Sequence, residues 1–268
     1  MNIFEGLFQL LVFNFDGFVT IFNSTSIEIT WLIFLIISFT SLLILLKFFG
    51  EVGLYVFTTV AVIVANIQVL KIVKFPFFNE PVALGTILFA STFLCTDILA
   101  EYYGTKSARK NILLGFSGFL LMTILMLFTI GFKPLNEIEI SESYAWALPI
   151  QDHLLGIFMP FPIFFGASMI AYLTSQFFDV WFFDKISKIT NKKFLWLRNN
   201  FSTIISSLID NTLFSIFAWI IFNPNPLDFN TVLFTFIFGT YVLRIIIALF
   251  DTPFIYLAKF FLPNNYNE

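Results

Sequence analysis

Long apolar runs separated by short polar segments divide most of the chain. Several of these runs approach or exceed the ~20 residues that an α-helix needs to cross a bilayer. The pattern therefore predicts an all-α, polytopic membrane helix bundle with about seven transmembrane helices. The expected helices cover about residues 28–48, 52–72, 81–104, 111–132, 154–183, 200–222 and 229 onward.

The first apolar run is interrupted more often than the others. Residues 3–22 contain Gln9, Asn14, Asp16 and Gly17 within an otherwise apolar stretch. Such a segment is typical of a helix that lies in the membrane interface. We therefore expect an interfacial helix here rather than a membrane span.

Prolines indicate where the expected helices are irregular. Pro81 suits the first turn of the third span. Pro160 and Pro162 fall near the start of the fifth span, so we expect its first turns to be irregular or re-entrant. Pro253 lies within the last span, which we expect it to kink or split.

The composition supports membrane insertion. The chain is 59% hydrophobic and 12% charged, whereas a soluble domain is about 25% charged. The single cysteine, Cys95, excludes an internal disulfide. The sequence lacks a Cys/His cluster for zinc and a G-x-x-x-x-G-K phosphate-binding loop. We therefore expect no cofactor, no metal and no ATP hydrolysis by the chain itself.

Basic residues predict the orientation, because cytoplasmic loops are enriched in Lys and Arg. Two loops are basic, at residues 104–110 and 185–198. Seven spans place both loops on the same side of the membrane. We therefore expect a multi-pass protein of the bacterial inner membrane with a cytoplasmic C-terminus.

Two carboxylates lie at the end of the third span. Asp97 and Glu101 are four residues apart, so they share one helix face. Their position near a helix C-terminus is unfavourable, because the helix dipole is already negative there. We expect substrate or proton binding for this pair, or charge pairing with Lys106 or Arg109. Asp97 is the deeper candidate, and Glu101 alternatively pairs with the basic loop.

The fifth span contains a polar stripe on an otherwise apolar helix. Tyr172, Ser175, Gln176 and Asp179 follow one another at spacings of three and four residues. Interhelical hydrogen bonding would account for Ser175 alone. The whole stripe is better explained by a ligand-binding or proton-coupling role.

The last two spans contain further polar residues. Thr203, Ser206, Ser207 and Asp210 lie roughly on one face of the sixth span. Ser and Thr residues are common at close-packed membrane interfaces, but an aspartate about ten residues into a span is not. In the last span Arg244 and Asp251 are seven residues apart on one face, which favours an internal ion pair.

Buried acids and amides on four helices suit a flat molecule rich in hydrogen-bond donors. A carboxylate can accept two N–H bonds from the edge of a guanine-like ring, and aromatic side chains can stack on its face. The same acids would also suit a proton-coupled carrier. His153, the only histidine, lies in a loop, and no nucleophile–base pair stands out. We therefore do not expect an enzyme.

Four stretches resemble the queuosine precursor transporter family, also described as vitamin-uptake-like integral membrane proteins. They occur in the family's order and cover about residues 55–260. The stretches are "TDILAEYYGTKSARK", "ASMIAYLTSQFFDVWFFDKI", "KKFLWLRNNFSTIISSLIDNTLFSIFAW" and "DTPFIYL".

The resemblance implies a six-helix transporter core, here residues 51–268. It implies import of a 7-deazaguanine such as preQ0, preQ1 or queuine for transfer RNA modification. Residues 1–50 depart from the family and look like an N-terminal addition. The positions that match the family's motifs are Asp97, Glu101, Gly104, Ser175, Gln176, Asp179, Arg198, Asn199, Ser202, Thr203 and Asp210.

The residues are also compatible with other functions. The chain could be the substrate-binding subunit of an energy-coupled vitamin-type importer, or a membrane enzyme acting on lipid. Partners would be the small-molecule substrate and membrane lipid, with homo-oligomer formation open and no nucleic acid expected. The transporter hypothesis predicts that Asp97→Asn abolishes uptake while the protein still folds and inserts.

Overall fold

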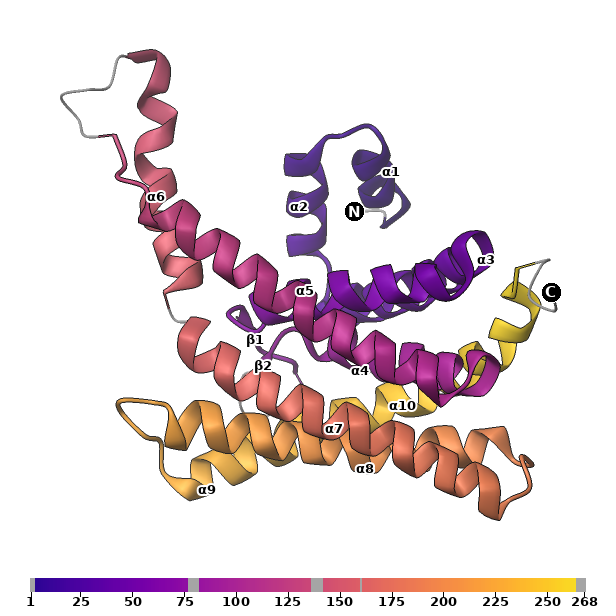
Figure 1. The fold of residues 1–268 in the computed structure, drawn as a ribbon. Helices are drawn as coiled ribbons and strands as arrows, with labels where there is room; N and C mark the ends of the chain where they lie inside the picture. The colour runs from indigo at the N-terminus through magenta and orange to yellow at the C-terminus, as the bar shows by residue number, and fades with distance from the viewer. Residues whose placement is uncertain (1–2, 77–81, 136–141, 160, 264–268) are drawn as a thin grey trace.

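The structure, a computed structural model, is an all-α helix bundle of the polytopic membrane type (Figure 1). It describes residues 3–76, 82–135, 142–159 and 161–263. Within these ranges the only strands are β1 (Ile72–Val73) and β2 (Val82–Ala83), which pair antiparallel with Ile72 opposite Ala83. Helices long and apolar enough to cross a membrane lie at Ile27–Gln68, Thr105–Gly131, Ile163–Ile189, Leu195–Ile221 and Phe229–Phe261.

The N-terminal segment folds as two short helices rather than the single helix expected over residues 3–22. These are α1 (Ile3–Leu11) and α2 (Phe15–Ser24). The chain breaks between them because Phe13 adopts a left-handed φ of 59° and the Asn14 side chain caps α2. Neither helix reaches the ~20 residues needed to cross a bilayer.

The first two expected spans form one helical hairpin, α3 (Ile27–Gln68). The hairpin reverses at Gly50, where φ is 58° and ψ is −138°. Only glycine adopts such a backbone conformation readily. The two halves then run back along each other, so α2 and β1 both join α3 at the same end of the bundle (Figure 1).

The third span is α4 (Thr86–Ile98), extended by a π-helical turn, η1 (Leu99–Tyr103). It ends at Gly104, as expected, where φ is 88°. The next helix, α5 (Thr105–Gly131), begins at once. The basic residues expected in a loop at 104–110 therefore lie on the first turns of α5.

The fifth span begins later than residue 154. A 3₁₀ turn, η2 (Glu142–Ala147), leads into the separate helix α6 (Leu148–Phe158). The span itself is α7 (Phe161–Ile189). Part of the predicted irregularity is confirmed, since α6 ends before Pro160. Pro160 itself lies outside the described residues, as does part of the acidic loop expected over residues 133–152.

The last two spans form a second helical hairpin. They comprise α8 (Leu195–Ile216) with η3 (Phe217–Ile221), and α9 (Phe229–Thr231), η4 (Val232–Phe238), α10 (Gly239–Ala258) and η5 (Lys259–Phe261). The expected basic loop at 185–198 is reduced to a short turn between α7 and α8. Asp228 caps α9, and its bonds to the Thr231 hydroxyl and backbone N–H lower the pKa of its carboxyl.

Of the two effects expected of Pro253, a kink or a split, the split is contradicted, because α10 continues through this residue. The irregular part of this span lies earlier, in the π-helical segment η4. A π-helical segment shifts the backbone hydrogen bonds by one residue and often lies at a functional site.

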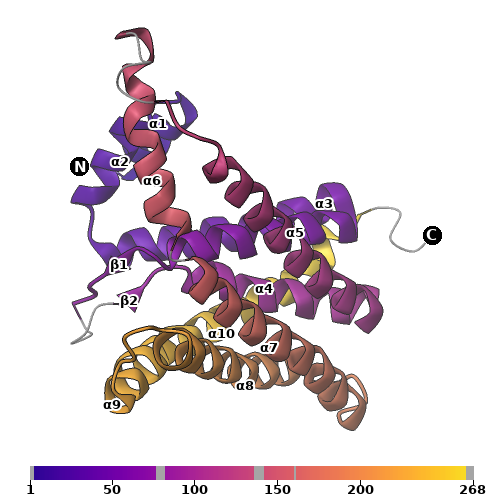
Figure 2. The same cartoon turned by 60° about the vertical axis from the view of Figure 1, so that its left-hand side comes forward.

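α4 occupies the centre of the bundle. It contacts α3 and α5 on one side and α7, α8 and α10 on the other (Figure 2). Of its 13 residues, 12 are buried. Large apolar side chains such as Leu121, Phe128, Phe234 and Leu249 are instead exposed on the surrounding helices. A bundle with an apolar exterior and a partly polar centre suits a bilayer environment.

Candidate functional site

Buried polar side chains gather where α4, α7, α8 and α10 meet. They form two groups. The first, which we call the Asp210 cluster, contains Ser175, Asp210, Asn211, Thr240 and Arg244. The second, which we call the Asp97 cluster, contains Asp97, Asp179, Asn199, Thr203 and Asp251.

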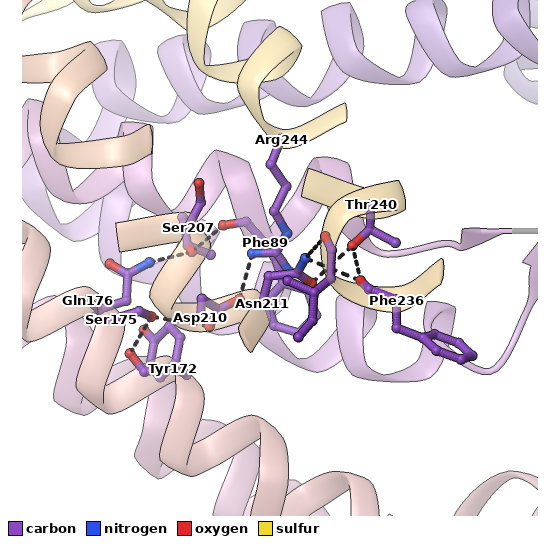
Figure 3. A network of polar contacts seen from close by, with 12 residues as sticks. Phe89, Tyr172, Ser175, Gln176, Ser207, Asp210, Asn211, Phe236, Thr240 and Arg244 are labelled. Atoms are coloured by element: carbon purple, nitrogen blue, oxygen red, sulfur yellow. Dashed lines mark hydrogen bonds and ion pairs between the residues drawn. The ribbon is translucent and has the colours of Figure 1, made fainter. Parts of the chain in front are cut away.

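An ion pair forms the centre of the Asp210 cluster (Figure 3). Arg244 Nη1 on α10 lies 2.6 Å from Asp210 Oδ2 on α8, and each residue is over 90% buried. The Ser175 hydroxyl on α7 donates to Asp210 Oδ1 at 3.1 Å. The ion pair expected between Arg244 and Asp251 is therefore wrong. The spacing of Arg244 and Asp251 shows only that both lie on one face of the helix. The guanidinium of Arg244 instead pairs with Asp210 on the neighbouring helix.

Asn211 joins the Asp210 cluster to the π-helical segment η4. Its amide donates to the carbonyl oxygens of Phe236 at 3.2 Å and Ile237 at 2.7 Å. Its own oxygen accepts from the Thr240 hydroxyl at 3.0 Å. The shifted hydrogen bonds of η4 make these carbonyls available. Asn211 was not among the residues predicted from the sequence, although a second polar residue next to Asp210 in a span could have indicated it.

A small cavity adjoins the Asp210 cluster. It holds about 40 Å³, which is enough for water but not for a bicyclic base. Asp210, Arg244 and Ser168 are among its lining residues, and the Ser168 hydroxyl has no partner among the described residues. Aromatic side chains form much of the remaining wall, namely Phe89, Phe214, Trp219 and Phe236.

Gln176 connects α7 to α4 beside both clusters. Its oxygen accepts from the Thr96 hydroxyl at 2.7 Å, and its amide donates to Thr92 Oγ1 at 2.8 Å. Both threonines are partners that the sequence analysis missed. The Tyr172 side chain, one turn earlier, is buried near Gly115 of α5. The predicted stripe on α7 is thus buried, but its members face different neighbours.

The Asp97 cluster brings three fully buried aspartates together from three helices. The Thr203 hydroxyl donates to Asp97 Oδ2 at 3.2 Å, and the Asn199 amide donates to Asp251 Oδ1 at 2.6 Å. Asp179 is close enough to interact with Asp97, but among the described residues no donor forms a hydrogen bond of good geometry with either Asp179 oxygen.

Glu101 lies outside both clusters, in a separate ion pair. Arg198 holds it with two contacts, Nη2 to Oε1 at 2.6 Å and Nε to Oε2 at 3.1 Å. Arg198 also donates to the carbonyl oxygens of Lys192 and Lys193. Pairing of Glu101 with a basic residue is confirmed, but the partner is Arg198 rather than Lys106 or Arg109. Glu101 thereby anchors the α7–α8 turn.

Apolar helices enclosing buried ionisable clusters define a multi-pass membrane protein with a polar centre. The chain belongs to the family described as "Putative vitamin uptake transporter", whose model matches residues 83–258. It is 34% identical over 236 residues to a Bacillus subtilis (strain 168) protein named "Probable queuosine precursor transporter". This similarity covers 88% of the chain and 96% of the relative. The comparison with solved structures found no match.

These findings confirm the resemblance to the queuosine precursor transporter family. The matched residues 83–258 contain both polar clusters and the Glu101–Arg198 pair. The chain is therefore a membrane protein of a transporter family, in which a small-molecule substrate and a lipid environment are expected.

Proposed function

We propose that the chain imports a 7-deazaguanine queuosine precursor and binds it at the Asp210 cluster. The observation that supports this most directly is the 34% identity, over 96% of its length, to the relative named as a probable queuosine precursor transporter. The proposed class is a transporter rather than an enzyme. The proposed substrates are preQ0, preQ1 and queuine.

The chemistry of the Asp210 cluster suits this substrate class. A 7-deazaguanine offers a ring N–H and an amino group on one edge, and a carboxylate can accept both. Asp210 would be that acceptor, with Ser175 orienting it. Arg244 has a guanidinium N–H without a partner within the described chain, at Nε, and it could donate to the ring carbonyl. Aromatic residues such as Phe89 and Trp219 would stack on the ring.

The cavity is too small for the substrate, so binding requires the helices to move apart. A larger pocket of about 670 Å³ lies next to it, between α2, α3 and the β1–β2 hairpin. The two spaces share Ala83, Leu84 and Thr86 as lining residues. We therefore place the entry route at this end of the bundle, with the segment between β2 and α4 as the barrier. This arrangement would correspond to a closed state of the carrier.

The two basic segments lie at the opposite end of the bundle. The α7–α8 turn is tied to η1 through Arg198 and Glu101, and η1 leads directly into α5. Positive residues favour the cytoplasm, so we propose that this end faces inward. Gly50 and Pro263 lie close together there, which would also place the end of the described chain on the cytoplasmic side.

Queuosine in transfer RNA provides the test. The chain would be expressed in a bacterial host that lacks both precursor synthesis and its own importer but processes each supplied precursor. We expect queuosine only when the chain is present. Asp210→Asn should abolish it because the carboxylate acceptor is lost. Asp184→Asn, on an exposed pair with Lys188, is the matched control and should retain it.

Each alternative outcome identifies a different error. Queuosine formed equally without the chain, or normally with Asp210→Asn, would contradict the proposed transport or the proposed site, respectively. No queuosine with any precursor, despite confirmed membrane insertion, would favour the substrate-binding subunit. Copurification with an ATP-driven module would then identify that subunit's partner.

A further inference from the structure

The Asp97 cluster contains three carboxyl groups and no basic side chain. Asp97, Asp179 and Asp251 come from α4, α7 and α10, and each is fully buried. Asp97 interacts electrostatically with both of the other aspartates. Neighbouring carboxylates that are shielded from water repel one another strongly, so they are not all ionised together unless a cation neutralises them.

The charged groups around this cluster are already paired. Arg198, on the neighbouring turn of α8, is bound to Glu101 and to two backbone carbonyl oxygens. Arg244, further along α10, is bound to Asp210. The remaining titratable side chains nearby on η1, Tyr102 and Tyr103, are also engaged, Tyr102 with the Ile255 carbonyl oxygen. Neither arginine is therefore available to neutralise the three aspartates.

The hydrogen-bond inventory of the cluster shows a shortage of donors. Within the described chain, Asp97 Oδ1, Asp251 Oδ2 and both oxygens of Asp179 accept no hydrogen bond of good geometry, although the Ser202 hydroxyl lies near Asp179. The Asn199 oxygen and the Ser206 hydroxyl are buried and unpartnered too, and Ser206 lies near Asp179. An ionised carboxylate only accepts hydrogen bonds, whereas a protonated carboxyl also donates one. A bound proton would therefore remove both the charge repulsion and part of the donor shortage.

The cluster is also mechanically connected to the proposed substrate site. α7 contributes Ser175 to one site and Asp179 to the other, one helical turn apart. α8 contributes Asp210 and Thr203, seven residues apart, which is about 10 Å along a helix. A movement of α7 that admits a substrate beside Asp210 must also move Asp179 relative to Asp97 and Asp251, and a movement of α8 must shift the Thr203 hydroxyl that donates to Asp97.

We propose that Asp97, Asp179 and Asp251 form a proton-binding site, separate from the substrate cavity, that couples import to the proton gradient. The cluster takes up one proton from the outer side and releases it to the cytoplasm as the substrate crosses. This inference rests on the proposed transport function for its coupling role. The protonated state itself is independent of the substrate's identity.

The first experiment detects the proton directly. Infrared spectroscopy of the purified full chain in liposomes would be compared between wild type and Asp179→Asn. A C=O band of a protonated carboxyl should be present at neutral pH in the wild type, and Asp179→Asn should remove or shift it. Asp184→Asn, the same change at an exposed position of α7, should leave the band in place. Absence of any such band in the wild type would overturn the proposal.

The second experiment measures coupling in the same liposomes. Labelled precursor should accumulate when the outside is made more acidic, and a trapped pH dye should report acidification of the lumen as it enters. In Asp97→Asn and Asp179→Asn, accumulation driven by the gradient should be lost. Exchange of labelled for unlabelled precursor, which needs no net proton movement, separates the two hypotheses. Net uptake without acidification of the lumen in the wild type, or accumulation driven by a sodium gradient alone, would overturn proton coupling and leave transport standing. No exchange would contradict the transport function itself.

Discussion

Arg244 and Asp210 form an ion pair inside the bundle. The two side chains are 2.6 Å apart, and both are over 90% buried. Removing one member of such a pair leaves an uncompensated charge, whereas removing both charges leaves two neutral groups. Single and double variants of the pair can therefore separate the effect of its charges on the stability of the protein from its role in transport.

We expect Arg244→Gln to destabilise the protein by about 3–5 kcal/mol. The double variant Arg244→Gln with Asp210→Asn should recover much of that loss, because no charge remains buried. Thermal unfolding of the detergent-purified variants is the measurement. Equal destabilisation in the single and double variants would show that the side chains act through packing rather than charge.

At this scale the sequence predicted which residues lie inside but not which residues they contact. Asp97, Asp179 and Asp210 were expected in a polar interior, and all three are buried. The partners of Arg244 and Glu101 were wrong because they depend on the rotation of one helix against another. Helical spacing within one segment contains no information on that rotation.

Gly50 determines how the first two spans are joined. Its φ of 58° and ψ of −138° reverse the chain between the two halves of α3. The reversal brings the halves so close that a Cβ at Gly53 would lie 2.2 Å from the Leu45 carbonyl oxygen. The hairpin thus depends on glycine for its turn and for its close packing.

Gly50→Ala should destabilise the fold by about 1–3 kcal/mol, because an L side chain is strained in this conformation. Gly131→Ala is the matched control, since a Cβ there meets no atom within 4 Å and φ is not positive. Unfolding of both variants in the same detergent provides the comparison. A Gly50→Ala variant as stable as Gly131→Ala would mean that the turn can rearrange.

Element boundaries followed the sequence where local signals are strong. Gly104 ends the third span as expected, because glycine readily adopts the positive φ found there. The sequence predicted irregular first turns for a span beginning near residue 154 but not two separate helices, α6 and α7, since a continuous apolar run does not indicate where a helix changes direction. The π-helical segment η4 also lacked a local signal, because its carbonyls are satisfied by Asn211 from another helix.

The whole molecule has two chemically different ends. The α7–α8 turn and η1 are joined by Arg198 and Glu101 at one end. The β1–β2 hairpin and the turn before α9 lie at the other (Figure 1). This polarity makes the orientation testable with two positions in short turns.

Asn191→Cys, between α7 and α8, should be protected from a membrane-impermeant maleimide in intact cells. Asn225→Cys, in the turn before α9, should react with it. The buried native Cys95 should contribute little background. After permeabilisation both introduced cysteines should react. The opposite labelling pattern in intact cells would invert the proposed orientation.

The central position of α4 has a consequence for biosynthesis. Two polar residues, Thr96 on α4 and Glu101 on the adjoining η1, have partners that are made much later: Gln176 follows Thr96 by 80 residues, and Arg198 follows Glu101 by 97. At about 5–20 residues per second, the ribosome needs roughly 5–20 s to supply Arg198. During that interval Glu101 lacks the basic side chain with which it pairs in the folded bundle. α4 should therefore reach its final place in the bundle only after α8 has been made, and a chain truncated before α8 should be a substrate for membrane quality control.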